Sequence, residues 1–160
     1  MAYDLGLRRQ EIVHLDVHDL DLSAGTAAVL GKGRTQKAKL TLPGPTRETL
    51  AAWLGARGSD PGPLFVRLDR AKKGRGRLDG SSVYRIIRAL GDRAGIRARP
   101  HGLRHSAITE LLELTGGNVS QVREFSRHAS VQTVLKYDDN RQDRARQLAG
   151  RLADDLGPAG

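Results

Sequence analysis

The sequence predicts an α+β fold that is mostly helical and contains a small antiparallel β-sheet or hairpin. Three observations support this prediction. Apolar residues recur at helical spacing along most of the chain, two short strand-like segments flank a glycine-bearing turn, and Gly or Pro marks many segment ends. With 160 residues, 38% of them hydrophobic and 28% charged, the chain is long enough for one domain with a hydrophobic core.

The amino-terminal part of the chain is predicted to form a helix followed by the hairpin. Ile12 and Leu15 lie three residues apart and begin the apolar face of the helix. Residues 26–30 are small and β-branched, and residues 37–42 alternate polar with apolar side chains. Between them, residues 31–36 form a basic tip that contains two glycines.

A second helix is expected to follow the hairpin. It begins at Gly44-Pro45, because proline suits the first helical turn, and it ends near Gly55 or Gly58. Residues 64–66 are predicted to be a short buried strand. Residues 67–80 are too charged and too rich in glycine to pack, so we expect a loop there.

The carboxy-terminal half is predicted to contain five helices. Ser81 or Ser82 would cap the first of them, and its apolar stripe consists of Val83, Ile86, Ile87 and Leu90. The other four are expected at residues 100–115, 119–126, 131–137 and about 141–156. Gly116-Gly117 would stop the helix that begins at Pro100, and Ser130 would cap the one over 131–137.

Positive charge is concentrated in one quarter of the chain. The formal charge is 27 − 18 = +9, and residues 67–104 hold 12 basic and 3 acidic residues, a net +9. Residues 1–66 hold 8 basic and 7 acidic residues, and residues 105–160 hold 7 and 8. Such a concentration favours a polyanion partner, nucleic acid above all, because each phosphate neutralised by Lys or Arg releases counterions. A solvated basic surface is the alternative.

The composition also argues against several other classes. No apolar run approaches the roughly 18 residues that a membrane span needs, so we expect no membrane partner. The absence of cysteine excludes a disulfide framework and a Cys-based zinc site. The first ten residues lack the apolar stretch of a secretory signal. A cytoplasmic, reducing compartment is the expectation.

The strongest local signal for chemistry is the segment P-H-G-L-R-H at residues 100–105. On a helix, His101 and Arg104 are three residues apart and project from the same face, which places an imidazole beside a fixed cation. This pairing suits an anionic, phosphate-like transition state, and a surface pair at the edge of the basic segment is the alternative. His128 ends one predicted helix, and Tyr137 ends the next.

Six residues, taken in order, resemble the catalytic set of the tyrosine recombinase (phage integrase) family. They are Arg8, Lys32, His101, Arg104, His128 and Tyr137. The resemblance also includes G-L-R followed by Glu11 and Ile12, the basic hairpin G-K-G, and the H-x-L-R-H box, and it covers nearly the whole chain. It implies the mostly helical catalytic core of the enzymes that break and rejoin DNA.

The resemblance implies a role for each residue of the set. Tyr137 would attack a DNA phosphodiester and form a 3′-phosphotyrosyl intermediate, followed by strand exchange and rejoining without a metal or other cofactor. Arg8 and Arg104 would clamp the non-bridging oxygens, Lys32 would protonate the 5′-hydroxyl, His101 would assist proton transfer and His128 would hydrogen-bond the phosphate. From charge and position, further contacts to double-stranded DNA are expected from Arg34, Lys72, Lys73, Arg75, Arg77, Tyr84, Arg85 and Arg88.

The sequence departs from the family pattern in two places. Ser126-Arg127 precede His128 where members usually have Leu-Gly. The chain also begins seven residues before Arg8, so we expect residues 1–160 to form a single catalytic domain that lacks the usual amino-terminal core-binding domain and the first catalytic-domain helix. A homo-oligomer on DNA, a tetramer at the nucleoid, is expected through the helix 141–156, whose apolar face is Ala145, Leu148, Leu152 and Leu156.

Three functions therefore remain open at the level of the sequence. The first is an active site-specific recombinase. The second is a catalytically inert or regulatory DNA-binding remnant of such an enzyme. The third is a metal-dependent phosphoesterase that uses the pairs His14/His18 and His101/His105, although no acidic ligands fall at supporting positions.

Overall fold

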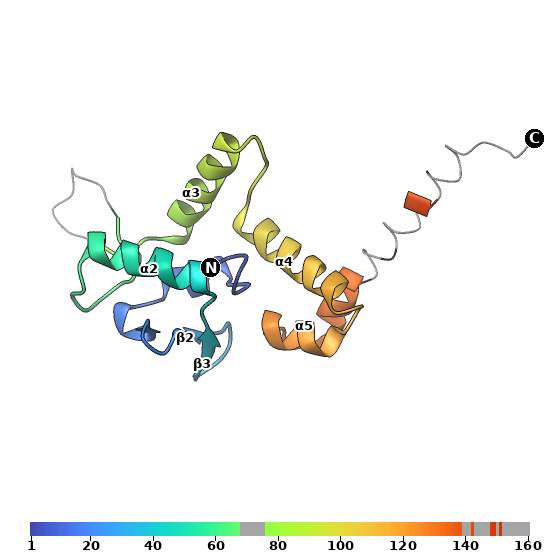
Figure 1. Cartoon of the computed structure of the whole chain (residues 1–160), viewed down its shortest axis with the longest axis horizontal. Coiled ribbons are helices and arrows are strands. Elements are labelled where there is room, and N and C mark those ends of the chain that lie inside the picture. Colours follow the sequence, from blue (N-terminus) through green and yellow to red (C-terminus); the bar gives the residue numbers. More distant parts are fainter. Residues whose placement is uncertain (68–75, 139–141, 143–147, 150, 152–160) are drawn as a thin grey trace, which may run out of the picture. The chain divides into compact units, whose positions relative to one another are not determined.

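The computed structural model describes residues 1–67, 76–138, 142, 148–149 and 151, and Figure 1 traces its helices and strands along the chain. The chain falls into two units, Met1–His105 and Ser106–Gly160, with the boundary inside helix α4 (Pro100–Leu114). The predicted α+β class is confirmed, because the described elements are mostly helical and include one three-stranded antiparallel sheet.

The sheet contains the predicted hairpin and one additional short strand. Its strands, in the order β1-β2-β3, are β1 (Leu20–Asp21), β2 (Thr26–Leu30) and β3 (Lys37–Thr41). The β2–β3 ladder extends to the pair Leu30↔Lys37, beyond which lies the tip. The sequence does not predict β1, because two residues are too few for an alternating pattern. The Asp21 carboxylate accepts a hydrogen bond from the Ala24 amide at 2.8 Å and closes the turn from β1 into β2.

The amino-terminal helix is shorter than the apolar pattern predicts. Helix α1 (Arg9–Val13) ends at His14 and is followed by the 3-10 turn η1 (Val17–Asp19). Leu7 and Leu15 lie just outside α1 on either side, and both are buried in the core of the first unit. Their apolar character therefore reflects burial, and it does not extend the helix.

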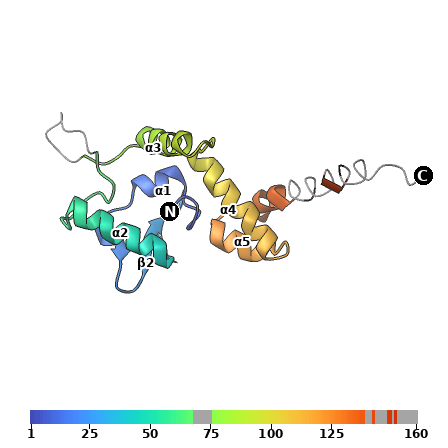
Figure 2. The same cartoon turned by 45° about the horizontal axis from the view of Figure 1, so that its top comes forward.

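Helix α2 (Gly44–Arg57) packs on the sheet, as Figures 1 and 2 show from two directions. Its Leu50 shares a buried cluster with Ala27 and Val29 of β2. The helix ends at Gly58, whose φ of 92° is accessible to glycine and costly for other residues. This position decides between the two helix ends that the sequence allows.

The predicted strand at residues 64–66 is wrong as a regular strand, although two of its residues are fully or almost fully buried. Leu64 is completely inaccessible and its amide donates to the Leu15 carbonyl at 2.8 Å. Val66 forms an isolated bridge with Arg77. The backbone hydrogen-bonds residues 15–17 through residues 62–64 and residues 76–78 through residues 65–67, so no continuous ladder with one segment forms. Burial explains the apolar run without a strand.

Helix α3 (Gly80–Arg93) begins slightly before the predicted start, and the face that it buries differs from the predicted one. Asp79 caps it by accepting a hydrogen bond from the Ser82 amide at 2.7 Å, so neither serine is the cap. Of the predicted apolar stripe, Val83 is buried, but Ile86 and Leu90 are 48% and 56% exposed. The buried face instead runs from Val83 to Gly91.

The reason for this rotation of α3 is the close packing at Gly91. A Cβ atom built there would lie 2.6 Å from the Cβ of Ala98, so only glycine permits this approach. Val83, the partly buried Ile87 and Gly91 follow one another at four-residue spacing and form the buried row, and Ile86 and Leu90, three and seven residues after Val83, lie beside that row.

The second unit is a small helical assembly around its own core. The carboxy-terminal half of α4 packs with α5 (Val119–Ser126) and with the helical residues 131–138. The core residues are Ile108, Leu112, Val122, Val134 and Tyr137. The Ser130 hydroxyl accepts from the Gln132 amide at 3.2 Å, in agreement with the predicted cap.

Most of the predicted helix 141–156 lies outside the described residues. Within it the structure describes only residues 142, 148, 149 and 151, all helical, and Leu148 is 64% exposed. In the described part of the chain, none of the helices combines the length and the apolar character that crossing a bilayer requires.

Candidate active site

The first predicted site residue, Arg8, is held by a carboxylate at the start of α1. Arg8 is the N-cap residue, and Glu11 at the third helical position reaches back to it. The Glu11 carboxylate accepts from the Arg8 amide at 2.8 Å and from Arg8 Nη1 at 2.9 Å. Glu11 is only 4% exposed, whereas the Arg8 side chain is 29% exposed. A buried anion therefore orients a more accessible guanidinium.

Glu11 has no role of its own among the sequence predictions, which include it only in the motif that begins with G-L-R. The signal that could have identified it is the spacing itself, because a glutamate three residues after an N-cap reaches back to the cap amide in a capping box. Here the same carboxylate also binds the cap side chain.

Arg104 contacts the segment that leads into Arg8. It lies on α4, is 2% exposed, and its Nη1 donates to the carbonyl of Gly6, two residues before Arg8. Gly6 has φ +53°, a left-handed conformation that suits glycine. The first unit therefore brings the side chain of Arg104 to the backbone that carries Arg8.

His101 lies one turn before Arg104 on α4 and is exposed. Its ring is 6.5 Å from that of His105 between centroids, in an edge-to-face arrangement with an interplanar angle of 73°. The three-residue spacing of His101 and Arg104 puts both on one side of the helix, as predicted, because α4 is continuous through them.

Lys32 lies at the tip of the hairpin, where a tight turn presents it. The Arg34 amide donates to the Gly31 carbonyl at 3.0 Å and closes the turn. Gly33 has φ +71°, which a turn of this kind requires at its third position. Lys32 and Arg34 are both exposed. Within the described part of the chain, Lys32 makes no hydrogen bond or ion pair.

His128 and Tyr137 lie ring to ring in the second unit. Their ring centroids are 6.0 Å apart and the interplanar angle is 28°, so the imidazole stacks on the phenol. Tyr137 belongs to the buried core of this unit and is 9% exposed. His128 Nδ1 is 3.0 Å from the hydroxyl of Ser126. The two rings thus meet from the ends of successive helical segments, where the sequence places His128 and Tyr137.

Four of the six predicted site residues thus belong to the first unit, and two to the second. Arg104 hydrogen-bonds the backbone that leads to Arg8, and His128 stacks on Tyr137. His101 shares the helix of Arg104, and Lys32 stands on the hairpin.

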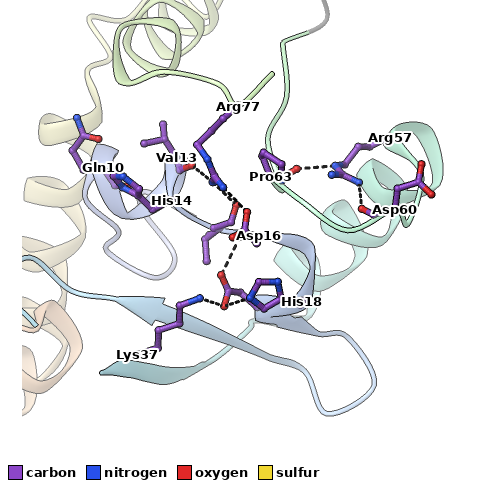
Figure 3. A network of polar contacts seen from close by, with 12 residues as sticks. Gln10, Val13, His14, Asp16, His18, Lys37, Arg57, Asp60, Pro63 and Arg77 are labelled. Atoms are coloured by element: carbon purple, nitrogen blue, oxygen red, sulfur yellow. Dashed lines mark hydrogen bonds and ion pairs between the residues drawn. The ribbon is translucent and has the colours of Figure 1, made fainter. Parts of the chain in front are cut away.

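The predicted DNA contacts differ strongly in their surroundings. Arg34 and Arg85 are exposed, and Tyr84 and Arg88 are partly buried. Lys72, Lys73 and Arg75 lie outside the described residues. Arg77 is occupied within the protein, as Figure 3 shows. Its Nη1 donates to the Val13 carbonyl at 2.7 Å, and its Nη2 donates to the Asp16 carboxylate at 2.5 Å.

Among the described residues, one cluster of three side chains could ligate a metal, as the phosphoesterase alternative requires. Asp16, His18 and Asp19 hold atoms within 4.8 Å of one another. Two cations already bind its carboxylates, because Arg77 pairs with Asp16, and Lys37 Nζ donates to Asp19 (Figure 3). These ion pairs account for the cluster without a metal.

Comparison with known proteins gives a consistent match over most of the chain. Residues 1–144 match the phage integrase family. The chain is 39% identical over 158 residues to a tyrosine recombinase of Synechocystis sp., covering 96% of this chain and 50% of that protein. It is 37% identical over 141 residues to the tyrosine recombinase XerC of Stutzerimonas stutzeri, covering 86% of this chain and 45% of that protein.

Solved structures agree with the sequence matches. The crystal structure of XerA recombinase is similar with a TM-score of 0.71 and 32% identity, over 91% of this chain and 53% of that one. The structure of the XerH site-specific recombinase bound to palindromic difH substrate has a TM-score of 0.74 and 26% identity, over 92% and 42%. The chain spans about half the length of the curated relatives it matches.

Proposed function

Because this chain belongs to the phage integrase family, we propose that it carries the catalytic residues of a site-specific DNA recombinase. The observation that carries the proposal is the stacking of His128 on Tyr137, which supports a role for the imidazole in binding phosphate and for the phenol in attack. The names of its relatives, tyrosine recombinases and a recombinase bound to its DNA substrate, support the same conclusion. As a protein acting on DNA, it would work at the nucleoid.

In the proposed reaction Tyr137 Oη attacks the phosphorus of a DNA phosphodiester. A bond forms between Oη and phosphorus, and the bond from phosphorus to the 5′-oxygen breaks, which leaves a 3′-phosphotyrosyl link and a 5′-hydroxyl. The phosphate bond is conserved, so attack by the 5′-hydroxyl of another strand reverses the step and rejoins the DNA. Neither water nor a metal takes part in this sequence.

Proton transfers on both sides of the phosphorus balance this step. The phenol loses its proton as it attacks, and His101 would assist this proton transfer. The departing 5′-oxygen needs a proton, which Lys32 Nζ would supply as general acid. An exposed lysine on a hairpin tip with no internal partner among the described residues suits this task, because nothing there competes for its ammonium.

Negative charge grows on the non-bridging oxygens as phosphorus becomes five-coordinate. Arg8 and Arg104 are proposed to bind these oxygens, because guanidinium groups present paired donors at fixed geometry. The Glu11 carboxylate supports this role by fixing Arg8 at two points. His128 would add a further hydrogen bond to the same phosphate.

The decisive experiment is trapping of the covalent intermediate. The chain is incubated with a pool of nicked duplexes of randomised sequence, with a chelator present, and protein-linked DNA is recovered under denaturing conditions. The expected result is an adduct that the chelator leaves intact and Tyr137→Phe abolishes. DNA retention without an adduct would instead support the inert DNA-binding remnant, and chelator-sensitive hydrolysis would support the phosphoesterase.

The role of Lys32 has a separate test on the DNA recovered in that experiment. General acid catalysis is worth about 10² to 10⁴ in rate, so Lys32→Ala should slow single-turnover cleavage by this factor and weaken DNA binding much less. Arg34→Ala on the same tip is the matched control and should affect binding more than cleavage. A large loss of affinity with normal cleavage by Lys32→Ala would rule out the acid role.

We also propose that the chain forms a homo-tetramer on DNA through residues 141–156. Support comes from the apolar spacing of that segment and from the exposure of Leu148. Sedimentation on DNA should show that a chain ending at Asp139 binds but no longer assembles. Unchanged assembly after this truncation would overturn the proposal.

A further inference from the structure

The turn that carries His128 has an unusual backbone in this chain. Helix α5 ends at Ser126, and Arg127 follows with φ +54° and ψ +35°, the left-handed conformation. Arg127 is the one residue other than glycine with a positive φ among the described residues. This conformation is costly for a residue with a side chain, so the surrounding contacts must hold it in place.

The left-handed turn brings the side chain of His128 back onto Ser126. The Arg127 amide donates to the Arg123 carbonyl at 2.8 Å and ends the helix. His128 Nδ1 then lies 3.0 Å from Ser126 Oγ, although the two residues are only two positions apart. Ser126 itself is completely buried, so its hydroxyl has to find its partners inside the protein.

The hydrogen-bond chemistry of Ser126 selects one form of the imidazole. Its Oγ is 3.3 Å from the Arg123 carbonyl, which can only accept, so this bond requires the hydroxyl proton. With that proton committed, Oγ offers a lone pair to His128, and the bond at 3.0 Å requires a proton on Nδ1. Both contacts are hydrogen bonds together only in this arrangement.

The orientation of the ring follows from the same contact. Stacking on Tyr137 fixes the plane of the imidazole, and the bond to Ser126 fixes its rotation within that plane. Nε2, the other ring nitrogen, is thereby directed away from Ser126. The family usually has Leu-Gly at positions 126 and 127. A leucine could not form this bond, and a glycine would adopt the turn without strain.

We propose that Ser126 is a positioning residue: its hydroxyl accepts a hydrogen bond from Nδ1 of His128 and thereby directs Nε2 toward the scissile phosphate. This inference rests on the proposed function of His128. In the neutral ring with a proton on Nδ1, Nε2 carries a lone pair, so the hydrogen bond from His128 to the phosphate is made by the doubly protonated imidazolium. Ser126 supports both forms, because Nδ1 is protonated in each.

The direct test is spectroscopic and does not depend on activity. In the full chain labelled with ¹⁵N-histidine, the ring nitrogens of His128, assigned by their loss in His128→Ala, should report the Nδ1-protonated tautomer at high pH. Ser126→Ala should shift the ring toward protonation at Nε2. An identical tautomer in both proteins would overturn the inference, whether or not the chain cleaves DNA.

The kinetic test uses a double-mutant cycle on the trapped cleavage reaction. Loss of a residue that orients another functional group commonly costs about 10- to 100-fold, and we expect about 10-fold for Ser126→Ala in single-turnover cleavage. In the His128→Ala background, Ser126→Ala should add nothing. Equal losses in both backgrounds would show a merely structural serine and overturn the proposal.

Two further variants separate positioning from folding. Thr115→Val is the matched control, because Thr115 Oγ1 also donates to a helix carbonyl, that of Leu111 at 2.7 Å, but touches no histidine among the contacts described. It should leave cleavage unchanged. Ser126→Cys keeps the volume with a weaker acceptor and should give an intermediate rate. If wild type forms no adduct, the proposed function fails, and the tautomer measurement alone decides the role of Ser126.

Discussion

Arginine side chains in this protein perform two different kinds of work. Arg57 and Arg77 bind backbone carbonyls within the first unit, as Figure 3 shows, and Arg57 is only 7% exposed. Arg85 is exposed, and among the described residues it donates a hydrogen bond to the Ser82 hydroxyl one turn earlier, at 3.1 Å. Local sequence does not separate these roles, since Arg77 and Arg85 lie in the same basic segment.

This difference predicts opposite outcomes for two substitutions. Arg77→Ala removes hydrogen bonds to the Val13 carbonyl and the Asp16 carboxylate and should lower the free energy of unfolding by about 2 kcal/mol. Arg85→Ala should leave stability nearly unchanged and reduce the salt slope of DNA binding by about 1, as expected for one lost phosphate contact. Urea unfolding and binding titrations at several salt concentrations measure both. If Arg77→Ala were as stable as wild type but had a reduced salt slope of DNA binding, Arg77 would be a DNA contact.

At the scale of elements, one ion pair ties the hairpin to η1. Lys37, at the base of the tip, donates to Asp19, and the Asp19 side chain is only 3% exposed. The Asp16 amide also donates to this carboxylate, at 3.0 Å. A buried carboxylate with these partners fixes the hairpin against the segment that follows α1.

Removing only one member of this ion pair should destabilise the fold more than removing both charges. Lys37→Met leaves the Asp19 charge buried without this partner, so it should lower the free energy of unfolding by about 2 kcal/mol. The loss is moderate because Lys37 is partly exposed, and solvent screens its attraction to Asp19. The double variant with Asp19→Asn should recover most of that loss. Thermal or urea unfolding of the four proteins measures the coupling. Additive effects would contradict it.

The cap of α3 gives a prediction about acid stability. The Ser82 amide donates to Asp79 and holds the pKa of that carboxyl below its ordinary value of 3.8. A lowered pKa in the folded state means that the stabilisation is fully present above the unfolded value and is lost as pH falls through the folded value. Asp79→Asn keeps a good cap that does not titrate.

The stability of Asp79→Asn should therefore match wild type at neutral pH and fall less steeply below about pH 4. Unfolding curves from neutral pH to about pH 2 provide the measurement. Asp21 gives a second position for comparison, because the Ala24 amide lowers the pKa of its carboxyl in a turn outside α3. A parallel fall of wild type and Asp79→Asn would show that the cap has no acid-dependent role.

The elements themselves could largely be predicted from the sequence, and their exposed faces could not. The hairpin, α2, α4 and α5 follow from short-range periodicity and from glycine or proline at their ends. The orientation of α3 depends on the contact of Gly91 with Ala98, a packing constraint that leaves no mark on the spacing of Ile86 and Leu90.

At the scale of the whole molecule, the basic segment 67–104 is the main electrostatic feature. Under the proposed function its cations bind DNA backbone together with Arg34 of the hairpin tip. If six phosphate contacts are formed, by Arg34, Lys72, Lys73, Arg75, Arg85 and Arg88, the slope of log affinity against log salt should be about −5. Binding titrations between low and physiological salt test this value. A slope near zero would mean that the basic segment does not contact DNA.

The sequence by itself determined the family, the order of the elements and the order of the proposed site residues. These depend on local spacing and residue type, which the chain carries along its length. Only the tertiary structure decided which charges are committed within the protein and which side chains contact the proposed site residues. Arg77 meets Asp16 across 61 positions, and Glu11, Lys37 and Ser126 gain their roles from partners that folding brings near. Such partnerships arise from burial and chain reversal, so they become visible only when the chain is folded.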